Sequence, residues 1–63
     1  MLFNDEIKND LKIAMIKKYG KTSYSQLANE LNVSRTSIYQ AISNKGSLDK
    51  LRDKIVEWIH INK

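Results

Sequence analysis

Two short apolar patterns, separated by only a few residues, constrain what this chain can fold into more than any other feature. The patterns comprise Leu27, Ala28, Leu31, Val33, Ile38 and Ala41. The small side chain of Ala28 allows two helix axes to approach to about 8–10 Å. Asn32 lies where the chain must reverse, and Asn is one of the few non-glycine residues that tolerate the left-handed conformation. The spacing therefore predicts two helices, over about 24–31 and 35–43, that pack across a tight turn.

Two serines supply a chemical reason for where these helices begin. A serine hydroxyl at the N-cap accepts a hydrogen bond from an otherwise unpaired backbone N–H of the first turn. Ser34 can do this for the second helix. Ser23, followed three residues later by Gln26, forms a capping-box pattern for the first. Both helix starts are therefore predicted by local chemistry.

The second helix separates polar from apolar side chains. At about 100° per residue, one arc of about 140° holds Arg35, Thr36, Tyr39, Gln40 and Ser43. The other side holds Ser37, Ile38, Ala41 and Ile42. This division is typical of a helix that packs through one face and presents the other to solvent or to a ligand.

Two further helices are predicted, one on either side of this pair. The first runs over about 5–19 with Asn4 or Asp5 as its N-cap. The last runs over about 48–60 and begins at a Ser47 cap. Their apolar stripes comprise Ile7, Leu11, Ala14 and Met15 in the first helix and Leu48, Leu51, Ile55 and Ile59 in the last. We expect these stripes to share one core.

The expected fold is all-α: a compact four-helix, or five-helix, single domain over residues 1–63. The sequence has no proline, and its two glycines, Gly20 and Gly46, fall at expected helix boundaries, which favours nearly continuous helix. Ile13 and Ile16 lie outside the apolar stripe of the first helix. We therefore expect the last helix or a partner to cover them.

The segment 23–43 resembles the helix-turn-helix of the lambdoid phage repressor and Cro family, also called XRE-type regulators, over about a third of the chain. The resemblance implies a lambda-repressor-like domain that binds double-stranded DNA through the major groove. The residues that it assigns to base reading are Arg35, Thr36, Tyr39 and Gln40. The residues that it assigns to phosphate contacts are Ser23, Tyr24, Ser34, Ser43, Asn44 and Lys45.

Two departures from the family pattern concern packing and the loop after the second helix. Many family members pair a Glu late in that helix with an Arg on the first helix, whereas this chain has Ile42 and Lys17 at these places. An apolar contact is therefore expected to replace the ion pair. The segment from Ile38 to Leu48 is also short and lacks the proline often found there.

Charge is distributed unevenly along the chain. The formal net charge is +4, yet residues 1–10 contain three carboxylates and one lysine. Residues 11–50 contain seven cationic side chains against two carboxylates. Such a basic region favours association with a polyanion and predicts an affinity that falls as salt rises, although it also fits a surface that serves solubility alone. Lys21, just before the pair of helices, is expected to attract phosphates.

The main hypothesis is a sequence-specific DNA-binding regulator, a Cro-like repressor of a phage or mobile element that acts by occupying a short palindromic operator. A homodimer is expected because paired readers need half-sites about one DNA turn apart. The candidates for the dimer interface are Val56, Trp58, Ile59 and Ile61. The alternative is a small protein-binding module, an antirepressor or inhibitor, built on the same scaffold.

Other function classes find little support in the sequence. It contains no cysteine, His60 is its only histidine, and it has no glycine-rich phosphate loop, so no catalytic centre, metal site or cofactor is expected. No apolar run approaches the roughly 20 residues that span a bilayer. The acidic start does not resemble a signal peptide. We therefore expect a cytoplasmic protein that binds no membrane and no small molecule.

Overall fold

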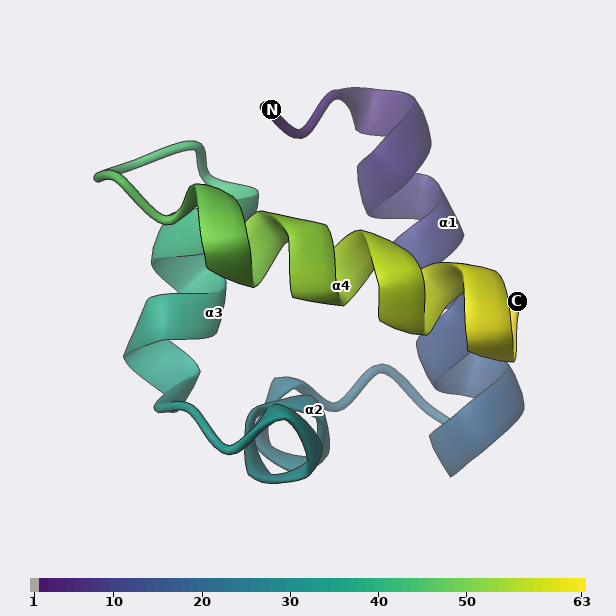
Figure 1. Cartoon of the computed structure of the whole chain (residues 1–63). Coiled ribbons are helices and arrows are strands. Elements are labelled where there is room, and N and C mark those ends of the chain that lie inside the picture. Colours follow the sequence, from purple (N-terminus) through teal and green to yellow (C-terminus); the bar gives the residue numbers. More distant parts are fainter. Residues whose placement is uncertain (1) are drawn as a thin grey trace.

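The computed structural model describes residues 2–63, which form four α-helices and no strand (Figure 1). The helices are α1 (Asp5–Tyr19), α2 (Tyr24–Leu31), α3 (Arg35–Ile42) and α4 (Asp49–Asn62). They form a body with principal extents of 29 × 23 × 16 Å. The prediction of an all-helical domain is confirmed, and the described part of the chain contains four helices, not five.

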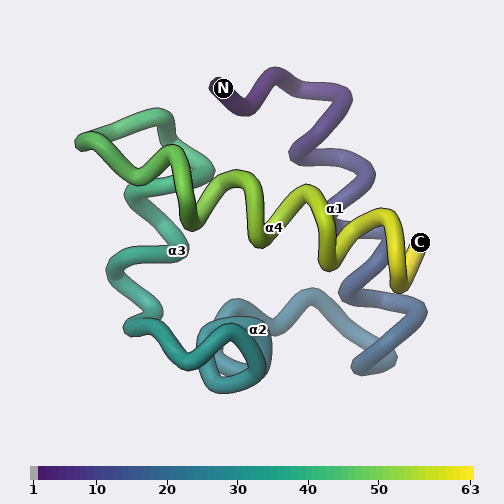
Figure 2. The backbone as a smooth tube through the Cα atoms, in the orientation of Figure 1, coloured from purple at the N-terminus to yellow at the C-terminus, as the bar shows by residue number. Residues whose placement is uncertain are grey.

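The last helix connects the others. α4 packs against both α1 and α3, while α2 packs against α3. In Figures 1 and 2, α4 runs across the front from α3 to α1, and the segment joining α3 to α4 extends outward at one corner. The buried apolar side chains are Phe3, Leu11, Ala14, Met15, Leu27, Ala28, Ile38, Ala41, Leu51, Ile55, Trp58 and Ile59. All four helices therefore contribute to one core.

Local chemistry accounts for both ends of α1. The Asn4 side-chain oxygen accepts a hydrogen bond of 2.8 Å from the Ile7 N–H, so Asn4 and not Asp5 is the N-cap. At the other end Gly20 has a φ of 79°, and its N–H donates to the Ile16 carbonyl over 2.8 Å. Glycine adopts this left-handed conformation without a steric penalty, which explains why the helix ends there.

The turn between α2 and α3 is formed as predicted. Asn32 has a φ of 58°, and the next N–H, that of Val33, returns to the Ala28 carbonyl at 3.0 Å. The Ser34 hydroxyl accepts from the Ser37 N–H at 3.1 Å and so begins α3. At the start of α2, the corresponding serine cap is longer, at 3.4 Å. α3 ends one residue earlier than predicted.

The start and the end of α4 differ from the prediction. Leu48 occupies the N-cap position and no side chain caps the helix, so the assignment of Ser47 as the cap is wrong. Ser47 lies one residue too early for its hydroxyl to reach the first turn. At the other end the helix continues to Asn62, whose side-chain amide donates to the Trp58 carbonyl at 2.9 Å. The Lys63 ammonium also pairs with Asp10 at 3.2 Å, which attaches this end to α1.

A buried arginine holds the end of α3 and the following loop. Arg52 is 1% exposed and is the only buried charged residue in the described part of the chain. Its Nε donates to the Ala41 carbonyl at 2.9 Å, and its Nη2 donates to the Lys45 carbonyl at 3.0 Å. Its Nη1 pairs with Asp49 at 3.2 Å. Arg52 therefore satisfies carbonyls that the end of α3 leaves without helical partners.

Two expectations about the outer surface can be compared with the structure. Ile13 and Ile16 are exposed, so α4 does not cover them as was expected. Ile42 is half-buried against the core while Lys17 is exposed, which fits the loss of an ion pair at these places. Within residues 2–63, no helix is both long enough and apolar enough to cross a membrane.

Candidate nucleic-acid interface

The polar arc predicted for α3 lies on the outside of the molecule. Arg35, Thr36, Tyr39 and Gln40 are all exposed on this one helix. On the opposite side of α3, Ile38 and Ala41 are completely buried. The apolar side therefore fixes the helix to the core, and the four polar side chains extend from a rigid element.

Arg35 is oriented by the preceding helix. Its Nη1 donates a hydrogen bond of 3.2 Å to the hydroxyl of Ser25, which lies ten residues earlier on α2. Both side chains are exposed, so this contact limits the positions of the guanidinium without burying it. The other guanidinium N–H groups remain directed at solvent or a ligand, and their planar arrangement suits a bidentate acceptor.

Tyr39 contacts α2 and remains accessible. Its ring lies 5.1 Å from the ring of Tyr24, centre to centre, at an angle of 55°. Tyr39 is nevertheless 46% exposed, so packing over the junction of α2 and α3 does not hide it. Burial raises the pKa of Tyr24, and the nearby Tyr39 raises it further. The phenol of Tyr24 is therefore protonated at neutral pH, as that of an ordinary tyrosine is.

The loop after α3 is anchored through Asn44. Its side-chain oxygen accepts from the Phe3 N–H at 2.6 Å, and its amide nitrogen donates to the Phe3 carbonyl at 2.8 Å. The backbone of Asn44 is left-handed, with a φ of 60°. Asn44 was predicted to contact phosphate, but in the structure its amide group binds the segment before α1, 41 residues away. The adjacent Ser43 and Lys45 are exposed.

The other predicted phosphate contacts surround α2 and the start of α3. Lys21 is exposed in the connection between α1 and α2. The hydroxyls of Ser23 and Ser34 accept hydrogen bonds as N-caps. An accepting hydroxyl still carries a proton that it can donate, although the Ser34 hydroxyl also lies 2.9 Å from that of Ser37. Of these residues, only Ser34 lies directly at the start of α3.

Two of the four predicted dimer-interface residues belong to the core of the chain itself. Trp58 is 5% exposed and Ile59 is 4% exposed, so the chain itself covers both side chains. Val56 is half-buried against the same core. Ile61, in contrast, is 74% exposed. The helical repeat of α4 indicated an apolar stripe but did not indicate how much of it α1 and α3 would cover.

A cluster that the sequence did not reveal joins three helices. The Glu30 carboxylate accepts from the Tyr19 hydroxyl at 2.8 Å and from the Trp58 indole N–H at 2.5 Å. The two rings stack with their centres 5.8 Å apart. The hydrogen bond from Tyr19 lowers the pKa of Glu30, while burial and then Glu30 itself raise the pKa of Tyr19. This cluster supports α2 from behind the polar arc.

Of the residues that sequence reasoning missed, Arg52 carried a usable signal. At about 100° per residue it lies within the arc of Leu48, Ile55 and Ile59, so a cation interrupts an apolar stripe. A charged residue there requires buried partners. Glu30 gave no such signal, because its two donors lie 11 and 28 residues away along the chain.

Comparisons with protein-family models, with curated proteins and with solved structures find no match to this chain. Within residues 2–63, no three side chains of the His, Cys, Asp or Glu type form a group that could hold a metal ion. The interpretation of the site therefore depends on its own geometry and charge.

Proposed function

We propose that this protein is a sequence-specific DNA-binding regulator in which α2 and α3 act as a helix-turn-helix of the phage repressor and Cro type. α3 enters the major groove, and the protein represses transcription by occupying a palindromic operator as a homodimer. The observation that carries the proposal is the exposed arc of Arg35, Thr36, Tyr39 and Gln40 on a helix whose other face is buried. An α-helix fits the width of the major groove of B-DNA.

The side chains of this arc match the chemistry of base edges. Arginine donates two hydrogen bonds to the O6 and N7 atoms of guanine, and glutamine pairs with the N6 and N7 atoms of adenine. The Thr36 methyl group can contact the methyl group of a thymine. Arg35 and Gln40 are therefore the residues that we assign to direct base recognition, with Thr36 and Tyr39 completing the contact.

Charge supports the same proposal. Seven cationic side chains within residues 11–50, against two carboxylates, surround the α2–α3 pair in sequence. Cationic side chains that neutralise phosphates release condensed counterions from the DNA. The logarithm of the binding constant therefore falls linearly with the logarithm of the salt concentration. Exposed Lys21 and Lys45 supply contacts of this sequence-independent kind.

The first prediction tests base recognition. A preferred duplex is selected from a random pool, and affinities for it and for a random duplex are measured at several salt concentrations. Arg35→Ala and Gln40→Ala each weaken binding to the preferred duplex by about 1–3 kcal/mol and change binding to random DNA little. Lys12→Ala removes an exposed cation from α1 and serves as the control, with no loss of selectivity.

The result also separates the proposal from its rival. Equal losses on both duplexes would place Arg35 and Gln40 on the backbone and not on bases. If no sequence is enriched and affinity for random duplex shows no salt dependence, the protein is not a DNA reader. The exposed Ile61 then favours the second candidate, a protein-binding module that uses the outer side of α4.

A further inference from the structure

A stripe of four residues follows the outer flank of α4. Lys50, Lys54, Glu57 and Ile61 are all exposed. Their spacing of four, three and four residues places them within about 60° of one another at about 100° per residue. This spacing is the one that keeps a line of side chains facing a second helix. Leu51, Ile55 and Ile59 of the same helix are buried, so the stripe forms one flank of the part of α4 that the chain leaves uncovered, with Asp53 and His60 exposed on the other flank.

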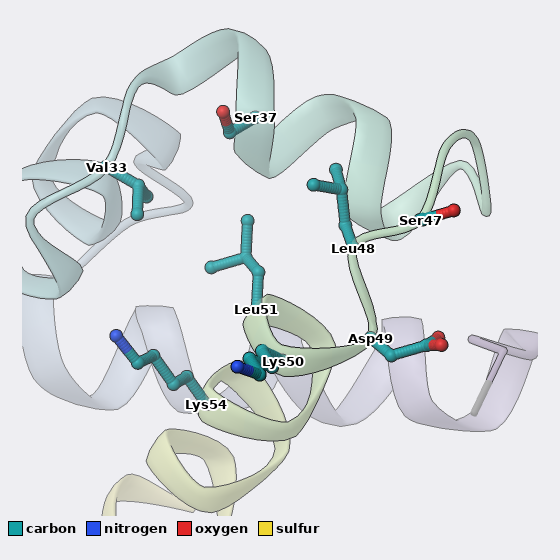
Figure 3. A pocket seen from close by; sticks show the side chains of 8 residues that line it. All are labelled: Val33, Ser37, Ser47, Leu48, Asp49, Lys50, Leu51 and Lys54. Atoms are coloured by element: carbon teal, nitrogen blue, oxygen red, sulfur yellow. The ribbon is translucent and has the colours of Figure 1, made fainter.

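A cavity opens beside one end of the stripe. It has a volume of about 550 Å³ and lies between α3 and the start of α4 (Figure 3). Leu51 and Leu48 extend from the α4 side into the space below α3, and Val33 approaches from the turn after α2. Lys50 and Lys54 lie at its edge. The cavity is thus an apolar hollow whose border carries two cations and the Asp49 carboxylate.

A second cavity continues along the same flank. It has a volume of about 230 Å³ and is lined by Leu31, Lys54, Glu57, Trp58 and Ile61. Lys54 borders both cavities, so the two are neighbours along this flank of α4, and we call the pair the groove. Ile61, the most exposed large apolar side chain of the described residues, stands at the far end. The groove therefore has a hollow at one end and a protruding side chain at the other.

We propose that a second copy of this chain occupies this groove, with the two α4 helices antiparallel about a twofold axis near residues 55 and 56. Lys54 then faces Glu57 of the partner subunit, and by symmetry the reverse pair forms. Ile61 of each chain lies over Lys50 and Leu51 of the other, at the larger cavity. An isologous contact requires this kind of self-complementary surface, in which two positions exchange partners.

Charge and shape favour this occupant over others. Neither Lys50 nor Lys54 forms an ion pair within residues 2–63, whereas Arg52 pairs with the nearby Asp49. An apolar anion would match the lysines but leave Glu57 and Ile61 without a counterpart. A second copy supplies an acid for each Lys54 and an apolar side chain for each hollow. Antiparallel packing also brings opposite helix ends together, which is favourable for their dipoles.

The proposed dimer leaves the polar arc of α3 accessible. The α3 residue that lines the groove is Ser37. It lies about 60° around the helix from Gln40 and farther from Arg35. The inference builds on the proposed function by naming the partner in the homodimer, but the contact itself forms without DNA. The proposed interface consists of exposed residues and does not include Trp58 or Ile59, which are buried within the chain.

Sedimentation equilibrium of the intact chain without DNA, from micromolar to millimolar concentration, tests the contact. Two helices bury less than the standard interface of about 1,600 Å², so association is weak. Ile61→Lys raises the dissociation constant at least tenfold, because a cation then replaces an apolar side chain and meets Lys50 and Lys54 at the border of the partner's hollow. The matched control is Ile16→Lys, at an exposed isoleucine on α1 outside the groove, which leaves association unchanged.

Charge reversal distinguishes contacts between chains from contacts within one. Lys54→Glu and Glu57→Lys each weaken association, and the double variant restores it. An equimolar mixture of the two single variants also restores a dimer, which contains one chain of each, because both cross-chain pairs are then opposite in charge. If Lys54 and Glu57 paired only within one helix, mixing the two single variants would not restore the dimer.

Disulfide cross-linking tests the antiparallel direction. Because the sequence contains no cysteine, only the introduced cysteines can react. In a Lys50→Cys and Ile61→Cys double variant the two sulfurs lie on one helix about 16 Å apart, too far for a bond within the chain. Mild oxidation therefore yields a covalent dimer, whereas Ile61→Cys alone stays unlinked.

Several outcomes overturn the inference. A wild-type chain that stays monomeric throughout, or a dimer that Ile16→Lys breaks and Ile61→Lys does not, contradicts it. So does a monomer whose Leu51 and Ile61 amide signals shift with decanoate or with an acidic amphipathic peptide, since the groove is then a site for that ligand. A dimer that binds no DNA rejects the proposed function alone, and a monomer that binds DNA selectively rejects this inference alone.

Discussion

At the scale of single residues, Arg52 shows how one side chain can organise a loop. Its guanidinium reaches the last turn of α3 and the following loop, and Asp49 supplies a counter-charge at 3.2 Å. A buried guanidinium is tolerated only where its donors are satisfied. The loop follows α3, the proposed reading helix. Because Arg52 donates to the Lys45 carbonyl, it also fixes the position of the exposed Lys45.

Replacing Arg52 is expected to destabilise the fold. Arg52→Met retains much of the apolar volume but removes the side-chain donors to the Ala41 and Lys45 carbonyls, so that Ala41 keeps only the N–H of Asn44 at 3.2 Å. A buried polar group left unpaired costs about 1–3 kcal/mol. Urea denaturation followed by Trp58 fluorescence measures the change. Lys12→Ala, an exposed cation on α1, should stay within about 0.5 kcal/mol of wild type. Equal stability of the two variants would show that the carbonyls find water instead.

The carboxylate of Glu30 makes stability depend on pH. Its pKa in the folded chain lies below the ordinary value of 4.5, because Tyr19 and then Trp58 donate to the ionised form. The stabilising contribution is therefore present above that ordinary value and is lost as pH falls through the lowered pKa. Denaturation midpoints across the acidic range should show a steeper decline for wild type than for Glu30→Gln. Parallel curves would mean that the carboxylate contributes nothing.

The same cluster acts in the opposite direction at alkaline pH. Burial and the hydrogen bond to Glu30 raise the pKa of Tyr19 well above the ordinary value of 10.0. The protonated phenol then stabilises the fold below that ordinary value, and the contribution disappears as pH rises toward the raised pKa. Tyr19→Phe should reduce the alkaline decline in the denaturation midpoint. An unchanged decline would assign it to other groups.

At the scale of elements, the geometry of α2 and α3 depends on one left-handed residue. Asn32 ends α2 with a φ of 58° and sends the chain into α3 after only two more residues. The short turn allows little freedom in the crossing of the two helices. Ala28, completely packed on α2, lets α3 approach. The position of the polar arc relative to α2 therefore follows from this turn.

Substitutions at Asn32 should separate conformation from side-chain chemistry. Asn32→Ala places a residue with a Cβ in the left-handed region and costs about 1 kcal/mol, whereas Asn32→Gly adopts that conformation freely and stays near wild type. Thermal unfolding of the two variants provides the comparison. If glycine is as harmful as alanine, the amide side chain and not the backbone is what the turn requires.

At the scale of the whole molecule, 63 residues build a small core. A single core of this size seldom supplies more than about 3–5 kcal/mol of net stability. The sequence contains no cysteine that could add a disulfide. Long-range contacts such as Asn44 with Phe3 and Lys63 with Asp10 attach both ends of the described chain to the helices. Self-association is a further source of stability available to such a fold.

If the groove along α4 holds a second copy, stability must depend on concentration. Binding to the folded state alone raises the melting temperature as the concentration of partner increases. Wild-type Tm should therefore rise across a series of protein concentrations, and the Tm of Ile61→Lys should stay constant. A wild-type Tm that does not change with concentration would contradict folding coupled to association.

The elements and their ends could be predicted from the sequence because they depend on neighbours. The N-caps at Ser23 and Ser34 and the left-handed ends at Gly20 and Asn32 involve groups within three or four residues. The polar arc of α3 follows from the helical repeat alone, so the candidate base-reading residues were found before any tertiary structure was considered. The start of α4 was not predicted because no side chain caps it, and the ends of α3 and α4 differ from the prediction by one and two residues.

The packing of the helices against one another determined which apolar residues are buried, which the helical repeat of the sequence does not specify. Trp58 and Ile59 became core and Ile61 remained outside because α1 and α3 cover only part of α4. Arg52 and Asn44 found partners 11 and 41 residues away. Local spacing specifies which residues share a face, since one helical turn joins them. The packing of one helix face against another depends on how the four helices fill a common volume. Only the tertiary structure determines this.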